Sequence, residues 1–285
     1  MAKPFLKWAG GKSKLINEIE PLIPENILIY AEPFLGGGAM LIHMLEIHPE
    51  TQVVFANDIN TSLITTWITV KDDCENLITE LQKLEEEYLP LDNTHRNDFY
   101  AQIRQEYNEI RKDIDGEQSL KIAAYFIFLN KVGYNGVYRE NGKGEFNVPR
   151  GSAVMPKICD EKNLREVSRL IQRVNFTNVD YRQVQFPCTP EIGEKIFVYL
   201  DPPYRDTNPL YTKEKFGDTQ QIQLKVYCNW LRDMGVKFVQ SNSFSEDGFL
   251  QELYKQYDIK EVECARAINS DGKKRGKIKE IIISN

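Results

Sequence analysis

The residues with the most specific chemistry are Asp201-Pro202-Pro203-Tyr204, which follow the apolar run Ile196–Leu200. An exocyclic amino nitrogen of a nucleobase is a poor nucleophile, because its lone pair is delocalised into the ring. A carboxylate and a backbone carbonyl that each accept one N–H would turn this nitrogen toward tetrahedral geometry and free the lone pair for attack on a methyl group. Asp201 and the carbonyl of Pro202 can form that pair of acceptors, so the motif predicts methyl transfer to an amine.

The rest of the motif suits the same chemistry. Pro202 and Pro203 fix φ and lack N–H groups, which holds the carbonyls at the strand end stiffly. Tyr204 offers an aromatic face on which a base can stack, an interaction worth roughly 1–3 kcal/mol. The alternative is a strand end followed by a proline turn and a packing tyrosine. We favour catalysis, because all four residues follow a run that has the composition of a buried strand.

Composition bounds the class of protein. With 285 residues, 41% hydrophobic and 27% charged, the chain can bury a large core, as one domain or as a domain with a large insertion. We expect a cytoplasmic protein, since no apolar run approaches the ~20 residues of a membrane span and the first residues do not resemble a signal peptide. Five scattered cysteines and three histidines predict reduced thiols, with no disulfide framework and no metal site.

The net charge of −6 is unevenly distributed. The segment from Asp72 to Glu117 holds 14 acidic and 5 basic residues, so it carries −9 and the rest of the chain +3. Between Asn130 and Lys157 the balance is basic, and aromatic residues and glycines are interleaved. This pattern suits either a nucleic-acid contact surface or a solvated hairpin.

A second motif, Glu32-Pro33-Phe34-Leu35-Gly36-Gly37-Gly38, lies between a predicted strand and a predicted helix. Glycines let the backbone approach a ligand closely, and Asp58, after the next predicted strand, could accept hydrogen bonds from ribose hydroxyls. We therefore predict a cofactor that contains a nucleoside. A nicotinamide or flavin site fits poorly, because Leu41 replaces its third glycine.

Two further motifs fit other enzymes poorly. Gly10-Gly11-Lys12-Ser13 resembles the end of an ATPase phosphate loop, but Leu6 stands where that loop has a glycine. Phe186-Pro187-Cys188 contains the proline-cysteine pair of enzymes that methylate a cytosine ring carbon, but it lies before the Asp201 strand in a predicted loop.

Apolar runs alternate with amphipathic segments, which predicts an α/β fold with a mainly parallel sheet. The expected strands are 27–31, 53–56, 174–178, 196–200 and 236–240, followed by an antiparallel hairpin of 258–265 and 277–284. The expected helices are 12–20, 39–46, 161–172, 219–234 and 247–255.

About a hundred residues interrupt this alternation. The first part is predicted to be helical, and residues 133–151, with five glycines, are predicted to be loop and hairpin. We therefore expect a catalytic domain formed by residues 1–59 and 158–285, with an inserted domain at 60–157.

Four segments resemble the Dam family of alpha-order, D12-class adenine-specific DNA methyltransferases, in the family's order and over nearly the whole chain. They are residues 4–12, the glycine motif 32–39, residues 130–151 and the Asp201 motif. The resemblance implies a Rossmann-like sheet that binds S-adenosylmethionine, joined to an inserted, mainly helical DNA-recognition domain with a β-hairpin. It also implies a GATC-type recognition site.

The resemblance implies roles for individual residues. The cofactor residues would be Trp8, Ala9, Gly10, Lys12, Glu32, Pro33, Phe34, Gly36, Gly38, Asp58, Asp180 and Asp201. The DNA-contacting residues would be Lys7, Tyr134, Asn135, Val137, Arg139, Asn147 and Arg150. Among these, Lys7 and Arg139 would read base edges, Tyr134 would wedge between base pairs, and Asn135 would fill the gap left by the flipped base. Lys131 differs from the arginine expected at its position, and Val137 is an apolar variant, so sequence preference carries over less directly than chemistry.

We thus expect a monomeric, nucleoid-associated enzyme that flips adenine out of double-stranded DNA and methylates its amino group without a metal. A cognate restriction endonuclease acting on the same site is a further partner to test. The same four catalytic residues could serve cytosine, RNA or a protein amide. Alternatives from other classes are an inert DNA-binding module and a nucleotide-dependent switch, which an intact Asp201 motif disfavours.

Overall fold

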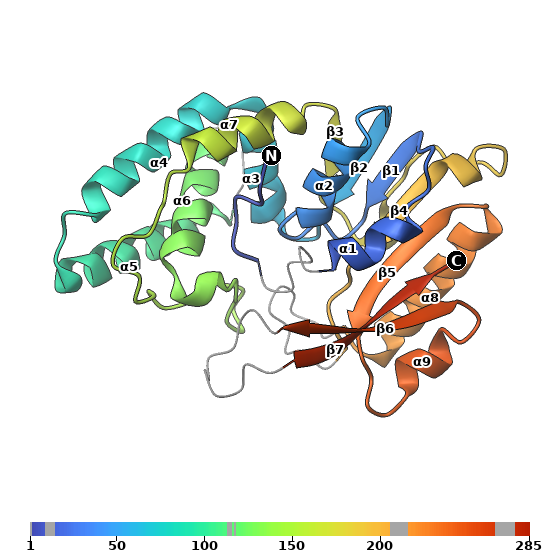
Figure 1. Cartoon of the computed structure of the whole chain (residues 1–285). Helices are drawn as coiled ribbons and strands as arrows, with labels where there is room; N and C mark the ends of the chain where they lie inside the picture. The colour runs from blue at the N-terminus through green and yellow to red at the C-terminus, as the bar shows by residue number, and fades with distance from the viewer. Residues whose placement is uncertain (1, 9–14, 113–115, 117, 206–215, 266–276) are drawn as a thin grey trace.

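The computed structural model describes residues 2–8, 15–112, 116, 118–205, 216–265 and 277–285. Seven strands form one sheet in the order β3-β2-β1-β4-β5-β7-β6 (Figure 1). The first five strands in this order are parallel, and β7 runs antiparallel to both of its neighbours. The strands are β1 (Ile29–Glu32), β2 (Val53–Asn57), β3 (Val174–Thr177), β4 (Ile196–Leu200), β5 (Lys237–Ser243), β6 (Asp258–Ala265) and β7 (Lys277–Ser284).

The strand predictions are confirmed, with bounds that agree at β4, β6 and β7 and differ by a few residues elsewhere. Strand β4 is buried along its whole length. Its odd and even residues enter two different hydrophobic clusters, one on each face of the sheet. A parallel strand covered on both faces reads as a continuous apolar run, which is why this strand was visible in the sequence.

Helices cover both faces of the sheet. Those that belong to the βα alternation are α1 (Ile16–Ile19), α2 (Ala39–Ile47), α7 (Glu161–Leu170), α8 (Asp218–Asp233) and α9 (Phe249–Leu253). The predicted helix 12–20 is described only from residue 15, and it gives way to a 3-10 turn, η2 (Glu20–Leu22), that contains Pro21. The predicted helix 247–255 is shorter because Gly248, at φ 72°, lies in the left-handed region at its start. Within the described residues, none of the helices is both long and apolar enough to span a bilayer.

The segment between β2 and β3 forms a helical lobe beside the sheet (Figure 1). It contains α3 (Thr61–Asp72), α4 (Cys74–Tyr88), α5 (Asn93–Ile110) and α6 (Ser119–Val132). Trp67 of α3 stacks on Phe176 of β3 with ring centroids 5.9 Å apart, and the lobe shares one hydrophobic cluster with a face of the sheet. A separate domain at 60–157 therefore stays a prediction.

Residues 133–151 pair only at two isolated antiparallel bridges, Gly133 with Arg150 and Glu140 with Phe146, so continuous hairpin strands are absent from this described segment. Across the second bridge, the N–H of Asn147 donates to the carbonyl of Arg139 at 3.1 Å and that of Asn141 to the carbonyl of Glu145 at 2.9 Å. The backbone groups of Phe146 that point away from this pairing face α5. Asn108 donates to the carbonyl of Phe146 at 3.0 Å and accepts from its N–H at 2.8 Å. The expected loop and hairpin is thus an irregular turn with antiparallel bridges but without continuous strands, and it is held against α5.

The start of β4 depends on a close backbone approach. In the 3-10 turn η5 (Gly193–Lys195), a Cβ on Gly193 would lie 1.9 Å from the carbonyl oxygen of Met234, at the end of α8. We expect Gly193→Ala to destabilise the fold by about 1–3 kcal/mol, because one backbone segment must shift. Gly142→Ala is the control, since nothing lies within 4 Å of a Cβ there. Urea unfolding of both variants measures the difference, and equal losses would contradict this account.

Candidate active site

The candidate site lies at the carboxyl ends of the parallel strands. The chain order reverses between β1 and β4, which are neighbours in the sheet. Open α/β sheets bind ligands at such a switch point. Glu32 ends β1 and Asp201 directly follows β4, so the two predicted carboxylates flank this point.

Glu32 is almost fully buried, at 2% exposure, and accepts a hydrogen bond from the Tyr30 hydroxyl at 2.8 Å. Burial raises the pKa of Glu32 well above its usual range, and the charges of Asp201 and Asp58 raise it further. The Tyr30 hydrogen bond acts in the opposite direction. The acidic side chains that follow β2 and β4 are therefore close enough to oppose the ionisation of Glu32 at the end of β1.

Asp58 is held by backbone amides. Its two carboxylate oxygens accept from the N–H groups of Gly36 and Asn60, each at 2.9 Å. Burial nevertheless raises the pKa of Asp58. The hydrogen bond to Gly36 joins the glycine turn after β1 to the end of β2, as the motif spacing predicts.

Trp8 lies against the glycine turn. A Cβ on Gly36 would lie 2.9 Å from the indole nitrogen of Trp8, and one on Gly37 would lie 2.7 Å from its Cβ. On its other side, Trp8 stacks on Tyr138 with ring centroids 6.0 Å apart. The predicted cofactor residues Ala9, Gly10 and Lys12 lie outside the described residues.

Asn57 connects the loops around the site and was not identified from the sequence. It is 1% exposed, and its amide donates to the carbonyls of Pro33 and Val179, both at 3.0 Å. Its oxygen accepts from the Thr177 hydroxyl and the Val179 N–H. One side chain thus fixes the loops after β1 and β3. The only sequence signal was a polar residue at the end of an apolar strand.

Asp201 and Tyr204 interact with further buried groups. Burial raises the pKa of Tyr204 above its usual range, and Asp201 and Glu280 raise it further. The Tyr204 hydroxyl also hydrogen-bonds Glu280 of β7, a residue that is 7% exposed. Glu280 was missed because β7 reaches the site only through its pairing with β5, in which Glu280 faces Ser243.

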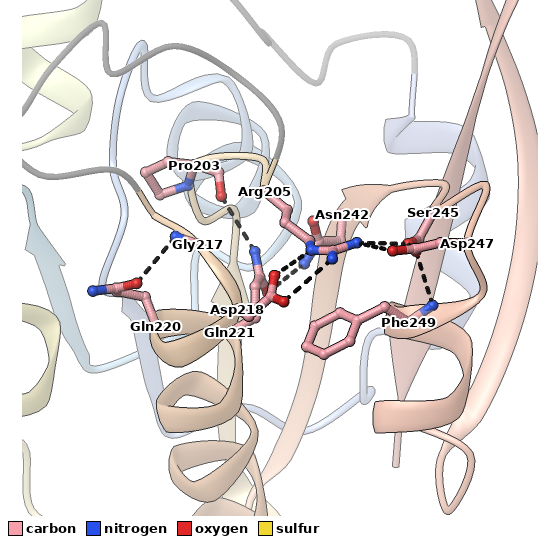
Figure 2. A network of polar contacts seen from close by, with 10 residues as sticks. All are labelled: Pro203, Arg205, Gly217, Asp218, Gln220, Gln221, Asn242, Ser245, Asp247 and Phe249. Carbon is pink, nitrogen blue, oxygen red and sulfur yellow. Dashed lines mark hydrogen bonds and ion pairs between the residues drawn. The ribbon is translucent and has the colours of Figure 1, made fainter.

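Arg205, the residue after the motif, makes ion pairs with two carboxylates (Figure 2). It contacts Asp218 at the start of α8, and its Nη1 lies 2.6 Å from Asp247. Its guanidinium also lies 4.3 Å from the ring centroid of Phe249. The end of the motif is therefore fixed to both α8 and the segment before α9.

Asp180 lies after β3 and pairs with Arg182, whose Nε is 2.7 Å from Oδ1. Its hydrogen bonds with the Arg182 side chain lower the pKa of this carboxyl, which stays ionised.

Of the other predicted cofactor residues, Phe34 packs on Tyr181 with ring centroids 4.9 Å apart. A Cβ on Gly38, at φ 66°, would lie 2.4 Å from the Trp67 ring, so this position requires glycine.

The predicted DNA-contacting residues fall into two groups. Lys7 is tied to the 133–151 segment through Asn130, which donates to the carbonyls of Lys7 at 2.7 Å and Gly136 at 3.0 Å. Beside them, Tyr134 is 41% exposed and Asn135 adopts a left-handed φ of 54°.

The second group lies further along the segment. Nε of Arg139 donates to Oδ1 of Asn147 at 2.8 Å. Val137 lines a small cavity beside Tyr138. Arg150 instead contacts α5, where it donates to Asn93 and Asn97. DNA contact by all these residues stays a prediction.

Residues 8–268 match the family described as D12 class N6 adenine-specific DNA methyltransferase. The chain is 42% identical to the type II methyltransferase M.MjaIII of Methanocaldococcus jannaschii, over 99% of both chains. It is 33% identical to the type II methyltransferase M1.LlaDCHI of Lactococcus lactis subsp. cremoris, over 99% of this chain and 95% of that one. It is 30% identical to the DNA adenine methylase of Haemophilus influenzae, over 98% of this chain and 92% of that one.

The Rossmann-like sheet and its acidic switch point thus belong to a methyltransferase. The chain is a member of the D12 class of N6 adenine-specific DNA methyltransferases. The resemblance seen in the sequence is confirmed.

The buried Glu32 gives a testable pH dependence. Because its pKa is raised above the ordinary 4.5, the folded protein holds this proton more tightly than the unfolded chain. This contribution to stability is complete below pH 4.5 and is lost as the pH rises through the raised pKa. The stability of Glu32→Gln relative to wild type should therefore increase with pH above 4.5, by up to about 1.4 kcal/mol per pH unit.

Glu50→Gln is a control of opposite sign. Hydrogen bonds from its own backbone N–H and from His48 lower the pKa of Glu50, so its contribution appears as the pH rises and is lost as the pH falls. Urea unfolding at a series of pH values measures both variants. Parallel curves for wild type and Glu32→Gln would rule out a raised pKa for Glu32.

Proposed function

We propose that this adenine-specific DNA methyltransferase uses S-adenosylmethionine and methylates the N6 amino group of an adenine that is flipped out of duplex DNA, within a GATC-type site. The observation that carries the proposal is the meeting of Glu32, Asp58 and Asp201 at the switch point of the sheet. Each of them ends or follows a strand at the edge of the sheet where open α/β sheets bind their ligands, which supports the proposal.

The acidic groups fit the chemistry of this cofactor. S-adenosylmethionine supplies, when bound, a methyl group on a positively charged sulfonium, and it carries an ammonium and two ribose hydroxyls. A positive charge near Glu32 would favour its ionised form, which burial and then the charges of Asp201 and Asp58 disfavour. The two oxygens of Asp58 accept from the N–H groups of Gly36 and Asn60, and a carboxylate with about four lone-pair sites can also accept from a hydroxyl.

The remaining cofactor contacts follow from the resemblance. Trp8 packs on the glycine turn, where its ring could border the cofactor. Pro33 and Phe34 would wall the methionine end. Asp180 would approach the adenine, but its ion pair with Arg182 competes for the same oxygens.

The Asp201 motif would act on the amine. Asp201 and the carbonyl of Pro202 would accept the two N–H groups and so expose the lone pair of the nitrogen for in-line attack. Flipping costs a few kcal/mol, which stacking of the base on Tyr204 would offset. The hydrogen bond to Glu280 supports this role, because it restricts the orientation of the Tyr204 ring.

Sequence recognition is assigned to Lys7 and the 133–151 segment. Tyr134 is exposed enough to enter a base-pair step, and Asn135 follows it in a left-handed turn. The bond from Arg139 to Asn147 would preorient the guanidinium for a guanine edge. Since two relatives are type II methyltransferases, a cognate restriction endonuclease is the partner we propose to look for.

Asp201→Ala tests the chemistry. We expect methyl transfer to fall at least about 10²–10³-fold, because the amine loses its charged acceptor, while cofactor binding persists. Single-turnover transfer of labelled methyl groups to DNA and calorimetric titration with cofactor measure the two effects. Asp233→Asn, at the far end of α8, is the control and should retain wild-type rates. Full turnover by Asp201→Ala would refute the assigned role.

Arg139→Ala tests base recognition. We expect discrimination between cognate and singly substituted sites to fall by about 1–3 kcal/mol, because one base contact is lost. The control, Lys143→Ala, removes an exposed charge from the same segment and should weaken binding to all sites equally. Competition binding on a panel of substituted duplexes separates the two patterns. An unchanged preference in Arg139→Ala would count against this assignment.

A further inference from the structure

Two buried amide side chains lie behind the Asp201 motif. Gln221 of α8 and Asn242 of β5 are both completely buried. The amide nitrogen of Gln221 donates to the carbonyl of Pro203 at 3.4 Å, and its oxygen accepts from Asn242 at 3.0 Å (Figure 2). The oxygen of Asn242 accepts in turn from the N–H of Ser243 at 2.9 Å. A continuous series of donors therefore runs from the backbone of β5 to the turn after β4.

The direction of this series is fixed at both ends. A backbone carbonyl such as that of Pro203 can only accept, and the backbone N–H of Ser243 can only donate. Both amides must therefore point their nitrogens toward the motif, since flipping either one would bring two donors or two acceptors together. Hydrogen bonds aligned in one direction also polarise and strengthen one another.

This series of hydrogen bonds ends on the carbonyl of Pro203, a residue whose ring restricts the backbone. The φ angle of Pro203 is fixed by its ring, so ψ is the free backbone torsion between this residue and Tyr204. The direction of the Pro203 carbonyl reports that torsion. A donor that holds the carbonyl also sets the peptide plane from which Tyr204 extends. Since Pro202 and Pro203 have no N–H groups, the donor must come from elsewhere in the fold.

We propose that Gln221, supported by Asn242, is a positioning residue for methyl transfer: it holds the Pro203 carbonyl and thereby orients Tyr204 and the carbonyl of Pro202 toward the target base. This inference rests on the proposed function of the motif. Arg205 fixes the other side of Tyr204 through Asp218 and Asp247. Both neighbours of Tyr204 are thus held: Gln221 holds the backbone carbonyl of Pro203, and two carboxylates hold the side chain of Arg205.

Gln221→Glu is the informative variant. An ionised carboxylate cannot donate to the Pro203 carbonyl and would repel it, whereas a protonated carboxyl can donate with one oxygen and accept from Asn242 with the other. Burial favours the protonated form, so it becomes populated within an accessible pH range. We expect single-turnover methyl transfer to be reduced about tenfold or more at high pH, and its ratio to wild type to rise as the pH falls.

Two variants control for charge and for folding. Gln220→Glu makes the same change one residue earlier, where Gln220 only accepts, from the N–H of Gly217 at 3.0 Å, so its ratio to wild type should stay near one at every pH. Gln221→Met keeps the volume without a donor or a charge, and its transfer should be slow at all pH values. Melting temperature and the dissociation constant for S-adenosylmethionine identify variants that fail to fold.

The outcomes separate the two proposals. Slow transfer by Gln221→Met, with recovery of Gln221→Glu at low pH and unchanged cofactor affinity, supports the positioning role. A wild-type rate in Gln221→Met, or a ratio for Gln221→Glu that does not depend on pH, overturns it. If the wild-type enzyme itself fails to methylate adenine in duplex DNA, the proposed function fails instead, whatever the variants do.

Discussion

The burial of a carboxyl beside two further acidic groups is the constraint on which this site depends. Glu32, Asp58 and Asp201 come from three different strand ends, and burial alone disfavours the charge of the first two. Hydrogen bonds offset part of this cost, since Glu32 accepts from the Tyr30 hydroxyl and Asp58 accepts from the Gly36 N–H. The sheet therefore carries a local destabilisation that a cationic ligand would relieve.

Such a cluster is useful only if the loops that carry it are rigid. Asn57 serves this purpose with four hydrogen bonds to the loops after β1 and β3. The glycine turn is wedged between the rings of Trp8 and Trp67. Polar cross-links and aromatic packing thus act on the same few residues, and both reduce the freedom of the acidic groups to move apart.

Some of these features could be predicted from the sequence and others could not. Strands β4, β6 and β7 were predicted with their observed bounds, because burial on both faces or strict alternation leaves a strong local pattern. In residues 133–151 the turn residues indicated a turn and a hairpin, but no local pattern could indicate that Asn108 of α5 would hold the outward backbone groups of Phe146. Asn57 and Gln221 were missed for a related reason: Asn57 follows an apolar strand and Gln221 lies among the polar residues that begin α8, so both read as surface positions until their long-range partners are known.

The dependence on distant residues follows from the motif itself. A turn with two successive prolines gains stiffness but cannot satisfy its carbonyls with its own N–H groups. Donors must then come from elements that fold around it, here Gln221 of α8, while Glu280 of β7 contacts the Tyr204 hydroxyl. Strand β7 is inserted antiparallel between β5 and β6, which brings the last strand of the chain beside a motif that ends about 75 residues earlier. The C-terminal hairpin therefore contacts the Asp201 motif through Glu280 as well as forming an edge of the sheet.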